Sequence, residues 1–166
     1  AAWAEEHLES LPIHIVTDCR TIEEMRARVL AELAGPDGVG LVVIDFLQRA
    51  KMARRGDDGH RDEQDRVYEA KGIANEGVPV IAVSSMSKSS QARANEGKVG
   101  VADTSGSGTE YAADLVAFLV RVNPEDKGAR VEVRFEVAKR RGGPLSSVTL
   151  MFDMTTGRFS TRDERA

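Results

Sequence analysis

The chain has 166 residues, a formal net charge of −4 and a single cysteine. This length is typical of one domain that buries roughly 70% of its unfolded surface, so we expect residues 1–166 to form a single domain. The charge excludes a global basic field, and any nucleic-acid binding must use a local patch. The single cysteine excludes a disulfide framework, and the apolar runs are too short for a membrane span of ~20 residues, which predicts a cytoplasmic protein with no membrane partner.

Helical and strand patterns alternate through the first third of the chain. Residues 3–8 have the pattern of the last turns of a helix, and residues 12–16 that of a short strand. Thr21 and Glu24 form a capping-box pattern, in which the threonine oxygen accepts from a backbone amide and the glutamate reaches back. Apolar residues at helical spacing follow and predict a helix that ends at residues 35–36.

The most informative segment is the run GLVVIDFLQ, residues 40–48. Its four consecutive apolar residues predict a strand, Leu41–Asp45, that is buried on both faces, as in a parallel sheet covered by helices. Asp45 then stands at the carboxyl end of the strand, where open α/β sheets bind ligands. In phosphate-loop nucleotide hydrolases an aspartate at such a position holds Mg²⁺. The same pattern also fits a buried strand that ends in a helix-capping aspartate.

A second buried strand is predicted further along the chain. A polar, basic segment at residues 49–61 precedes a helix predicted for Asp62–Asn75. The apolar run at residues 78–83 then predicts the strand, and Pro79 fits it because proline is tolerated near the first residue of a strand. Residues 84–109 contain almost no large apolar side chain, and we expect a long functional loop there.

The last third of the chain has the pattern of β structure. Leu115–Arg121, Val131–Val137 and Ser147–Phe152 are predicted strands. Apolar and charged residues alternate in the second of them, which predicts a strand with one exposed face. A basic turn, Lys139–Pro144, joins the last two strands, and a final turn is expected at residues 155–157.

Taken in order, these segments resemble the C-terminal motor domain of DnaB-like replicative helicases, which has the RecA fold. The resemblance implies an α/β, RecA-like three-layer fold with a mainly parallel central sheet and a C-terminal β-hairpin. No Gly-rich Lys-Ser/Thr phosphate loop occurs in the sequence, so we expect the second half of the motor domain, lacking the N-terminal phosphate-loop portion and inactive alone. The segments that carry the resemblance are Leu41–Gln48, Val78–Ser84, Glu110–Arg121, Val137–Pro144 and 148–159.

The resemblance implies a nucleotide site at the carboxyl ends of the two buried strands. Asp45 would hold the Mg²⁺ of bound ATP, with Gln48 and Ser85 also on the nucleotide side. Ser85 stands where the family usually has a glutamine that senses the γ-phosphate. A hydroxyl is shorter and offers one donor instead of two, which puts the coupling of hydrolysis to DNA binding in doubt.

The basic turn resembles the family's Lys-x-Arg pair, which a neighbouring subunit inserts at the γ-phosphate. Lys139 and Arg141 match this pair. A planar, permanently charged guanidinium stabilises the charge that spreads over the transferring phosphoryl oxygens, which is the chemistry of an arginine finger. A solvated basic turn is the plainer alternative, and it is our interpretation of Arg140.

Two basic segments, one after each buried strand, would face the central channel of a ring. Lysine and arginine beside glycine and serine suit contact with the phosphates of single-stranded DNA without sequence readout. No aromatic residue is interleaved, so base stacking is not indicated, and a merely solvated loop is the alternative. The candidate DNA-binding residues are Arg49, Lys51, Arg54, Arg55, Lys88, Arg93 and Lys98.

The leading hypothesis is part of an ATP-dependent, ring-forming DNA helicase that couples ATP hydrolysis to translocation on single-stranded DNA and duplex unwinding in replication. ATP and Mg²⁺ would bind between subunits of a homo-oligomeric ring, with six subunits as the family expectation. A RecA-fold ATPase of the recombinase or circadian-clock type is a second hypothesis, although the Asp-Phe-Leu-Gln ending and the basic turn favour the helicase. A non-catalytic DNA-binding or scaffold relative is a third, which a phosphate loop encoded upstream would exclude.

Overall fold

The computed structural model describes residues 11–53, 59–104 and 108–161, with only the backbone described for 59–63. The helix predicted at residues 3–8 and the candidate residues Arg54 and Arg55 lie outside these ranges. No helix in the described ranges is long and apolar enough to cross a bilayer. The elements in order are α2 (Ile22–Leu33), β1 (Val42–Ile44), η1 (Leu47–Arg49), α3 (Gly59–Asn75), β2 (Val80–Ala82), α4 (Lys88–Asn95), η2 (Val101–Asp103), α5 (Gly108–Ala112), β3 (Leu115–Arg121), β4 (Arg130–Arg140), β5 (Ser147–Asp153) and β6 (Arg158–Ser160).

The start of α2 confirms the predicted capping box. The Glu24 N–H donates to the Thr21 hydroxyl, and the Thr21 N–H donates to the Glu24 carboxylate, both at 3.2 Å. The next residue, Ile22, is fully buried and its N–H donates to the Lys51 carbonyl at 3.0 Å. The strand predicted at residues 12–16 is wrong: this segment is exposed and irregular, because no neighbouring strand pairs with it in the described residues.

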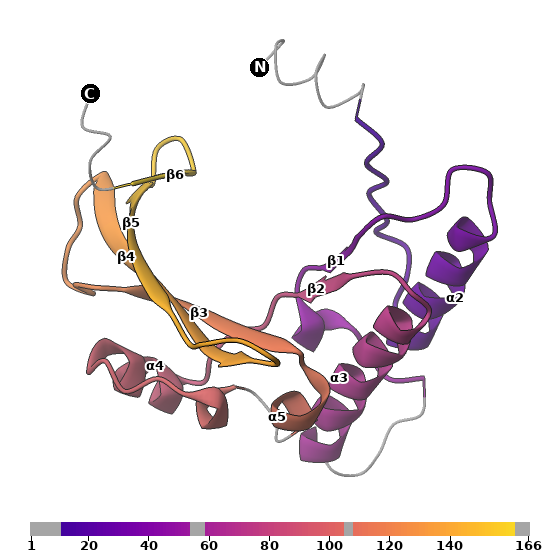
Figure 1. The fold of residues 1–166 in the computed structure, drawn as a ribbon, viewed down its shortest axis with the longest axis horizontal. Helices are drawn as coiled ribbons and strands as arrows, with labels where there is room; N and C mark the ends of the chain where they lie inside the picture. Colours follow the sequence, from indigo (N-terminus) through magenta and orange to yellow (C-terminus); the bar gives the residue numbers. More distant parts are fainter. Residues whose placement is uncertain (1–10, 54–58, 105–107, 162–166) are drawn as a thin grey trace.

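The two apolar runs form the adjacent parallel pair that the sequence predicts. One face of the pair is packed against α2 and α3, which lie on the same side of it in Figure 1. Ile44 of β1 is buried there with Val67, Ala70 and Ile73 of α3. The register sets Val42 opposite Val80, Val43 opposite Ile81 and Ile44 opposite Ala82.

The other face of the parallel pair is open, which corrects the prediction of strands buried on both faces. Val43 is 58% exposed and its partner Ile81 is 53% exposed. Leu41 and Val83, which have the same alternation, are also exposed. The described chain supplies helices to one face only, so it forms two of the three predicted layers around these strands.

The larger sheet is antiparallel, so the prediction of a mainly parallel sheet is also wrong for this chain. It has the order β3-β4-β5-β6 and contains the three strands predicted in the last third. Val116, Phe118 and Val120 on one face of β3 share a core with Ala94 of α4. Each pattern predicted its strand correctly, but a pattern of single strands does not fix which neighbour each strand pairs with.

The long loop predicted at residues 84–109 is wrong in part, because it contains α4 and η2. Ser87 begins α4 as its N-cap, and its hydroxyl accepts from the Ser90 N–H at 3.1 Å. The helix has small and polar residues and buries only Ser90 and Ala94. Its low apolar content therefore gave no helical periodicity to recognise.

Two isoleucines of equal size test this one-sided burial. Ile73→Ala should lower the free energy of unfolding by about 2–5 kcal/mol, because Ile73 is 0% exposed and its loss leaves a cavity. Ile81→Ala should cost below about 1 kcal/mol, because half of the side chain is already in water. Urea unfolding followed by circular dichroism measures both, and equal losses would mean that the face carrying Ile81 is covered.

Candidate functional site

The carboxyl ends of the two parallel strands bring the predicted nucleotide-side residues to one edge. Asp45 directly follows β1, Gln48 lies in η1, and Ser85 is just beyond β2. The backbone joins the two segments, because the Leu47 N–H donates to the Val83 carbonyl at 2.8 Å. The edge is therefore a fixed arrangement of groups from two strands, as the parallel pairing predicts.

Gln48 bridges the segments that follow β1 and β2. Its side-chain amide donates to the Ser84 hydroxyl at 2.7 Å, and its carbonyl oxygen accepts from the Ser85 N–H at 3.3 Å. Glutamine has both a donor and an acceptor group, so one side chain can make both contacts. Ser84 was not among the predicted residues; the only signal for it is that it is the first polar residue after the second apolar run.

The Asp45 carboxylate is exposed and makes no ion pair or hydrogen bond with the described residues. Those residues also contain no group of three or more histidine, cysteine or acidic side chains that could hold a metal. Mg²⁺ usually keeps several waters and binds through one or two carboxylates together with substrate phosphates. A single open carboxylate at this edge therefore fits Mg²⁺ that arrives with a nucleotide.

The basic turn lies elsewhere, beside the junction of α5 and β3. The Lys139 ammonium donates to the carbonyls of Glu110 and Ala113, the latter at 2.7 Å. Glu110 lies in α5 and Ala113 directly follows it, at the helix end where backbone acceptors lack partners within the helix. Lys139 thus ties the end of β4 to α5.

Arg141 is held at two points by one residue. Its backbone N–H donates to the Asp114 carbonyl at 2.8 Å, and its Nη1 lies 2.8 Å from Asp114 Oδ1. Asp114 Oδ2 lies 2.5 Å from Nζ of Lys71 on α3. The Arg141 side chain is nevertheless 64% exposed, so it is accessible to a partner from outside the chain. Arg140 beside it is exposed.

Asp114 is the negative charge among the basic side chains of Lys71, Lys139 and Arg141. The hydrogen bond from Lys71 holds the pKa of Asp114 below its ordinary value, and the charges of Lys71, Arg141 and Lys139 act in the same direction against partial desolvation. The carboxylate is therefore ionised at neutral pH. Sequence reasoning did not single out Asp114 or Lys71; the signal for Asp114 is its place immediately before the β3 apolar run.

In the described part of the first candidate DNA segment, residues 49–53, the backbone is fixed and the basic side chains are exposed. Arg49 and Lys51 are exposed. The Lys51 N–H donates to the Arg20 carbonyl at 3.1 Å, and both carboxylate oxygens of Glu23 lie 3.1 Å from the Ala53 nitrogen. These bonds fasten the segment to the start of α2, so the two cations project from a supported surface.

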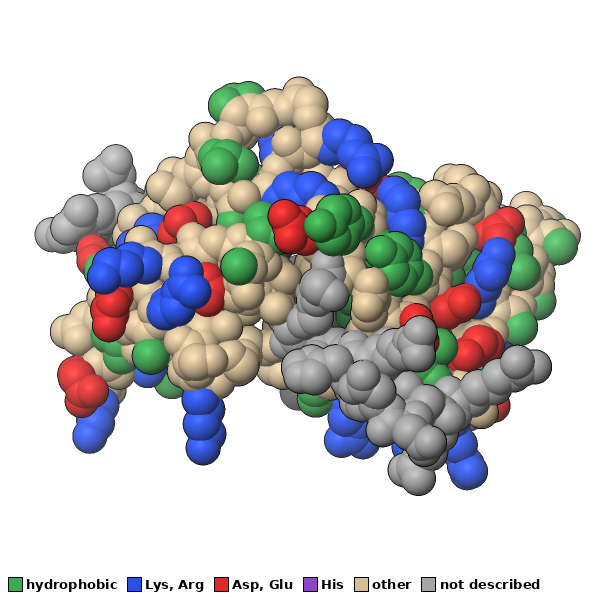
Figure 2. Space-filling model, turned by 90° about the horizontal axis from the view of Figure 1, so that it is seen from below, with side chains coloured by type: hydrophobic (Ala, Val, Ile, Leu, Met, Phe, Trp, Pro, Cys, Tyr) green, Lys and Arg blue, Asp and Glu red, His purple; other side chains and the backbone are tan. Residues whose placement is uncertain are grey.

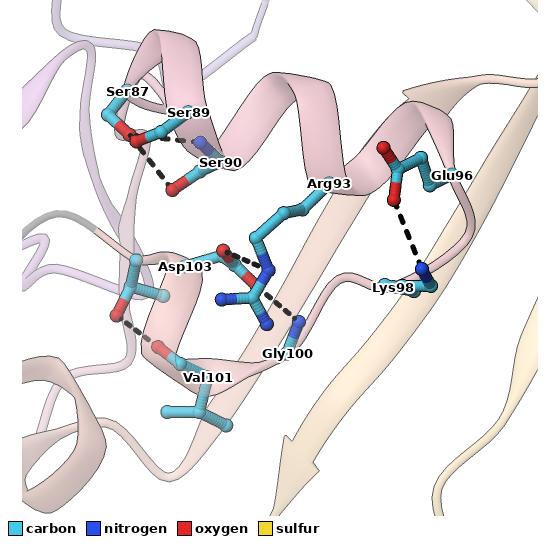
Figure 3. A network of polar contacts seen from close by, with 10 residues as sticks. Ser87, Ser89, Ser90, Arg93, Glu96, Lys98, Gly100, Val101 and Asp103 are labelled. Atoms are coloured by element: carbon cyan, nitrogen blue, oxygen red, sulfur yellow. Dashed lines mark hydrogen bonds and ion pairs between the residues drawn. The ribbon is translucent and has the colours of Figure 1, made fainter.

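In the second candidate DNA segment, Arg93 already has a structural partner. Its Nε lies 3.4 Å from Asp103 Oδ1, and Asp103 is only 3% exposed (Figure 3). The other Asp103 oxygen accepts from the Gly100 N–H at 2.9 Å. A buried carboxylate needs a compensating charge, and Arg93 supplies it.

The remaining cations of the second segment are more open. Lys88 and Lys98 are exposed, and Lys98 lies 3.2 Å from Glu96. Among the residues drawn in colour on the face in Figure 2, lysine and arginine side chains lie among acidic and apolar ones.

Comparison with known proteins identifies the family. The family model of the DnaB-like helicase C terminal domain matches residues 2–161. The chain belongs to this family. The replicative DNA helicase DnaC of Bacillus subtilis strain 168 is 33% identical over 149 residues, which cover 87% of the chain and 32% of that helicase. The DnaB helicase of Geobacillus stearothermophilus is 31% identical with the same coverage.

Solved structures of the family are similar in fold. The ATPase domain of G40P matches with a TM-score of 0.81 at 25% identity, over 98% of the chain and 59% of that domain. A DnaB-like replicative helicase, solved in a study of its interactions with primase, matches with the same TM-score over 40% of its length. The chain spans 32% of the length of the Bacillus subtilis and Geobacillus stearothermophilus helicases.

The charge cluster around Asp114 predicts a specific titration. Lys71→Met should raise the pKa of Asp114 toward the ordinary aspartate value, because the Lys71 hydrogen bond is the largest cause of its depression. Since a depressed carboxyl pKa stabilises the fold only above the ordinary pKa, the contribution of this contact should disappear as the pH falls through the pKa of Asp114. Carboxyl-detected NMR titration measures the shift.

Asp153 is an internal control in the same experiment. Its pKa is also lowered, but by hydrogen bonds from the Thr155 and Thr156 N–H groups. Lys71→Met should leave the Asp153 titration unchanged. An unchanged Asp114 pKa in the variant would show that Lys71 does not contact this carboxylate.

Proposed function

We propose that this chain is part of a subunit of an ATP-dependent, ring-forming DNA helicase, and that it supplies different residues to two neighbouring nucleotide sites. The observation that carries the proposal is the separation of the two groups of site residues. Asp45 is an open carboxylate at the edge of the parallel pair, whereas Arg141 lies on a turn of the antiparallel sheet. A head-to-tail ring places such unlike surfaces against each other at every interface.

On the first surface, Asp45 would hold the Mg²⁺ that accompanies ATP. The metal, when bound, neutralises charge on the phosphate oxygens. Gln48 keeps the segments after β1 and β2 in register through Ser84 and Ser85. The side chain of Ser85 is too short to copy the reach of a glutamine, so we assign Gln48 the task of fixing this edge and Ser85 a contact near the nucleotide.

On the second surface, Arg141 would stabilise the transferring phosphoryl group bound to the neighbouring subunit. Its guanidinium is permanently charged and exposed, and the backbone of Arg141 is fixed by its hydrogen bond to Asp114. These properties suit a group that must reach a partner in a defined position. Lys139, in β4 just before the turn, anchors the end of this strand to the carbonyls of Glu110 and Ala113. Hydrolysis would then depend on assembly of the ring.

Single-stranded DNA would contact the segments that follow the two parallel strands. Arg49 and Lys51 project from a supported backbone, and Lys88 and Lys98 are exposed on the second segment. Arg93 would contribute less, because it compensates the buried Asp103. Contact through separate cations would bind phosphates without sequence preference.

The open face of the parallel pair would be covered by the rest of the ATPase domain. The apolar face of Leu41, Val43, Ile81 and Val83 is exposed in this chain. The chain corresponds to 59% of the similar G40P ATPase domain, which leaves a large part of such a domain to pack there. This interpretation also supplies the phosphate loop that the 166 residues lack.

A non-catalytic DNA-binding or scaffold relative is the second candidate function. The observation that favours it is Ser85, in place of the usual glutamine. A phosphate loop in the coding sequence upstream of these residues would exclude it.

Mixing two inactive variants tests the helicase proposal, in a complete subunit with an intact phosphate loop. Asp45→Ala and Arg141→Ala should each lower ring ATPase activity by ~10³-fold or more, because they remove the metal ligand and the finger respectively. A mixture of the two variants should regain activity at interfaces that pair an intact Asp45 surface with an intact Arg141. Steady-state phosphate release measures the recovery.

The control for this experiment is subunit exchange, followed by energy transfer between labelled subunits. Arg140→Ala is the matched variant of the neighbouring arginine, and it should retain activity. If exchange is complete and the mixture stays inactive, Arg141 does not act in trans.

A further inference from the structure

Asp114 contacts both Arg141 and helix α3. Its carbonyl and its Oδ1 each lie 2.8 Å from a nitrogen of Arg141, and its Oδ2 lies 2.5 Å from Lys71 Nζ. The backbone contact fixes where Arg141 leaves the sheet, and the carboxylate contact orients its guanidinium. Gly142, with φ +80°, turns the chain immediately afterwards.

Three basic side chains surround the Asp114 carboxylate. Lys71, Lys139 and Arg141 all lie close enough to lower the pKa of Asp114. Three cations that converge on one junction repel each other, and one carboxylate between them reduces that repulsion. Without it, the exposed guanidinium would be the member of the group most able to swing away.

Lys71 extends the arrangement to the core beneath Asp45. It belongs to α3, whose Val67, Ala70 and Ile73 share a hydrophobic core with Ile44, the last residue of β1. The Lys71–Asp114 contact therefore connects the two nucleotide surfaces. It joins α3, which supports the strand that ends before Asp45, to Asp114, which holds Arg141.

We propose that Asp114 is a positioning residue, held by Lys71, that presents the Arg141 guanidinium to the nucleotide of the neighbouring subunit. This inference rests on the proposed role of Arg141 in trans. The carboxylate orients one edge of the guanidinium while the exposed remainder meets the phosphate. Displacement of a catalytic group by about 1 Å can cost roughly 100-fold in rate, so loss of this contact should act on the chemical step.

The test uses complete subunits assembled as rings, and measures kcat and KM for ATP. Asp114→Asn keeps the size of the side chain and removes its charge, and we expect a fall in kcat of roughly 10- to 100-fold with KM changed by less than about twofold. Exposed ion pairs contribute little to stability, so the variant should fold, and its unfolding temperature checks this. Asp153→Asn, at the end of β5, is the matched control and should leave kcat unchanged.

Lys71→Met separates positioning from a general effect of charge. It should lower kcat in the otherwise unchanged protein, by less than Asp114→Asn does. In the Asp114→Asn background it should cause no further fall, because Lys71 acts through Asp114. Equal effects of Lys71→Met in both backgrounds would overturn the proposed order of contacts.

The outcomes distinguish this inference from the function on which it rests. An active Arg141→Ala ring would contradict the proposed function itself. An inactive Arg141→Ala ring together with unchanged kcat in Asp114→Asn would overturn the role of Asp114 alone. A rise in kcat for Asp114→Asn would also overturn it, because Asp114 would then restrain Arg141 rather than present it.

Discussion

The packing of α3 against the parallel strand pair is the constraint on which the rest of the structure depends. One face of α3 buries Ile73 against the core that contains Ile44, and so supports the strand that ends at Asp45. The same helix receives α5 at very close range, because a Cβ at Gly108 would lie 2.8 Å from Cγ of Gln64. This approach brings the end of α5 and Asp114 within reach of Lys71. One helix thus positions both groups of candidate site residues.

The two surfaces differ in the chemistry they present. The edge after β1 and β2 carries an open carboxylate beside a glutamine that is fixed by two serines, which suits a divalent cation and a nucleotide. The turn after β4 carries the exposed, positively charged Arg141, which the ionised Asp114 holds in place. A positively charged guanidinium suits an anionic phosphate. A chain of the DnaB-like helicase family that presents both surfaces is suited to a site completed between subunits, which is the function we propose.

Local signals in the sequence predicted local structure, and the errors concern what covers or pairs with each element. The Thr21 capping box, the two apolar runs and the three later strands are each recognisable from residues close in sequence, and all are present. Burial of both faces of β1 and β2 was wrong, because an apolar run shows that a strand is covered in its complete fold but does not show which segment covers it. Helix α4 was missed because its small polar residues carry no periodicity. The contacts of Asp114 with Lys71 and Arg141 span long sequence separations, and only the folded chain brings them together.

In the proposed ring, Asp45 and Arg141 of one chain serve different nucleotide sites. The most direct measurement is a structure of the assembled ring of complete subunits, bound to Mg²⁺ and a non-hydrolysable ATP analogue. We expect each nucleotide to have Asp45 of one subunit on the metal side and Arg141 of the adjacent subunit at the γ-phosphate. Asp45 and Arg141 of the same subunit at one nucleotide, or Arg141 facing solvent at every fully occupied interface, would contradict this expectation.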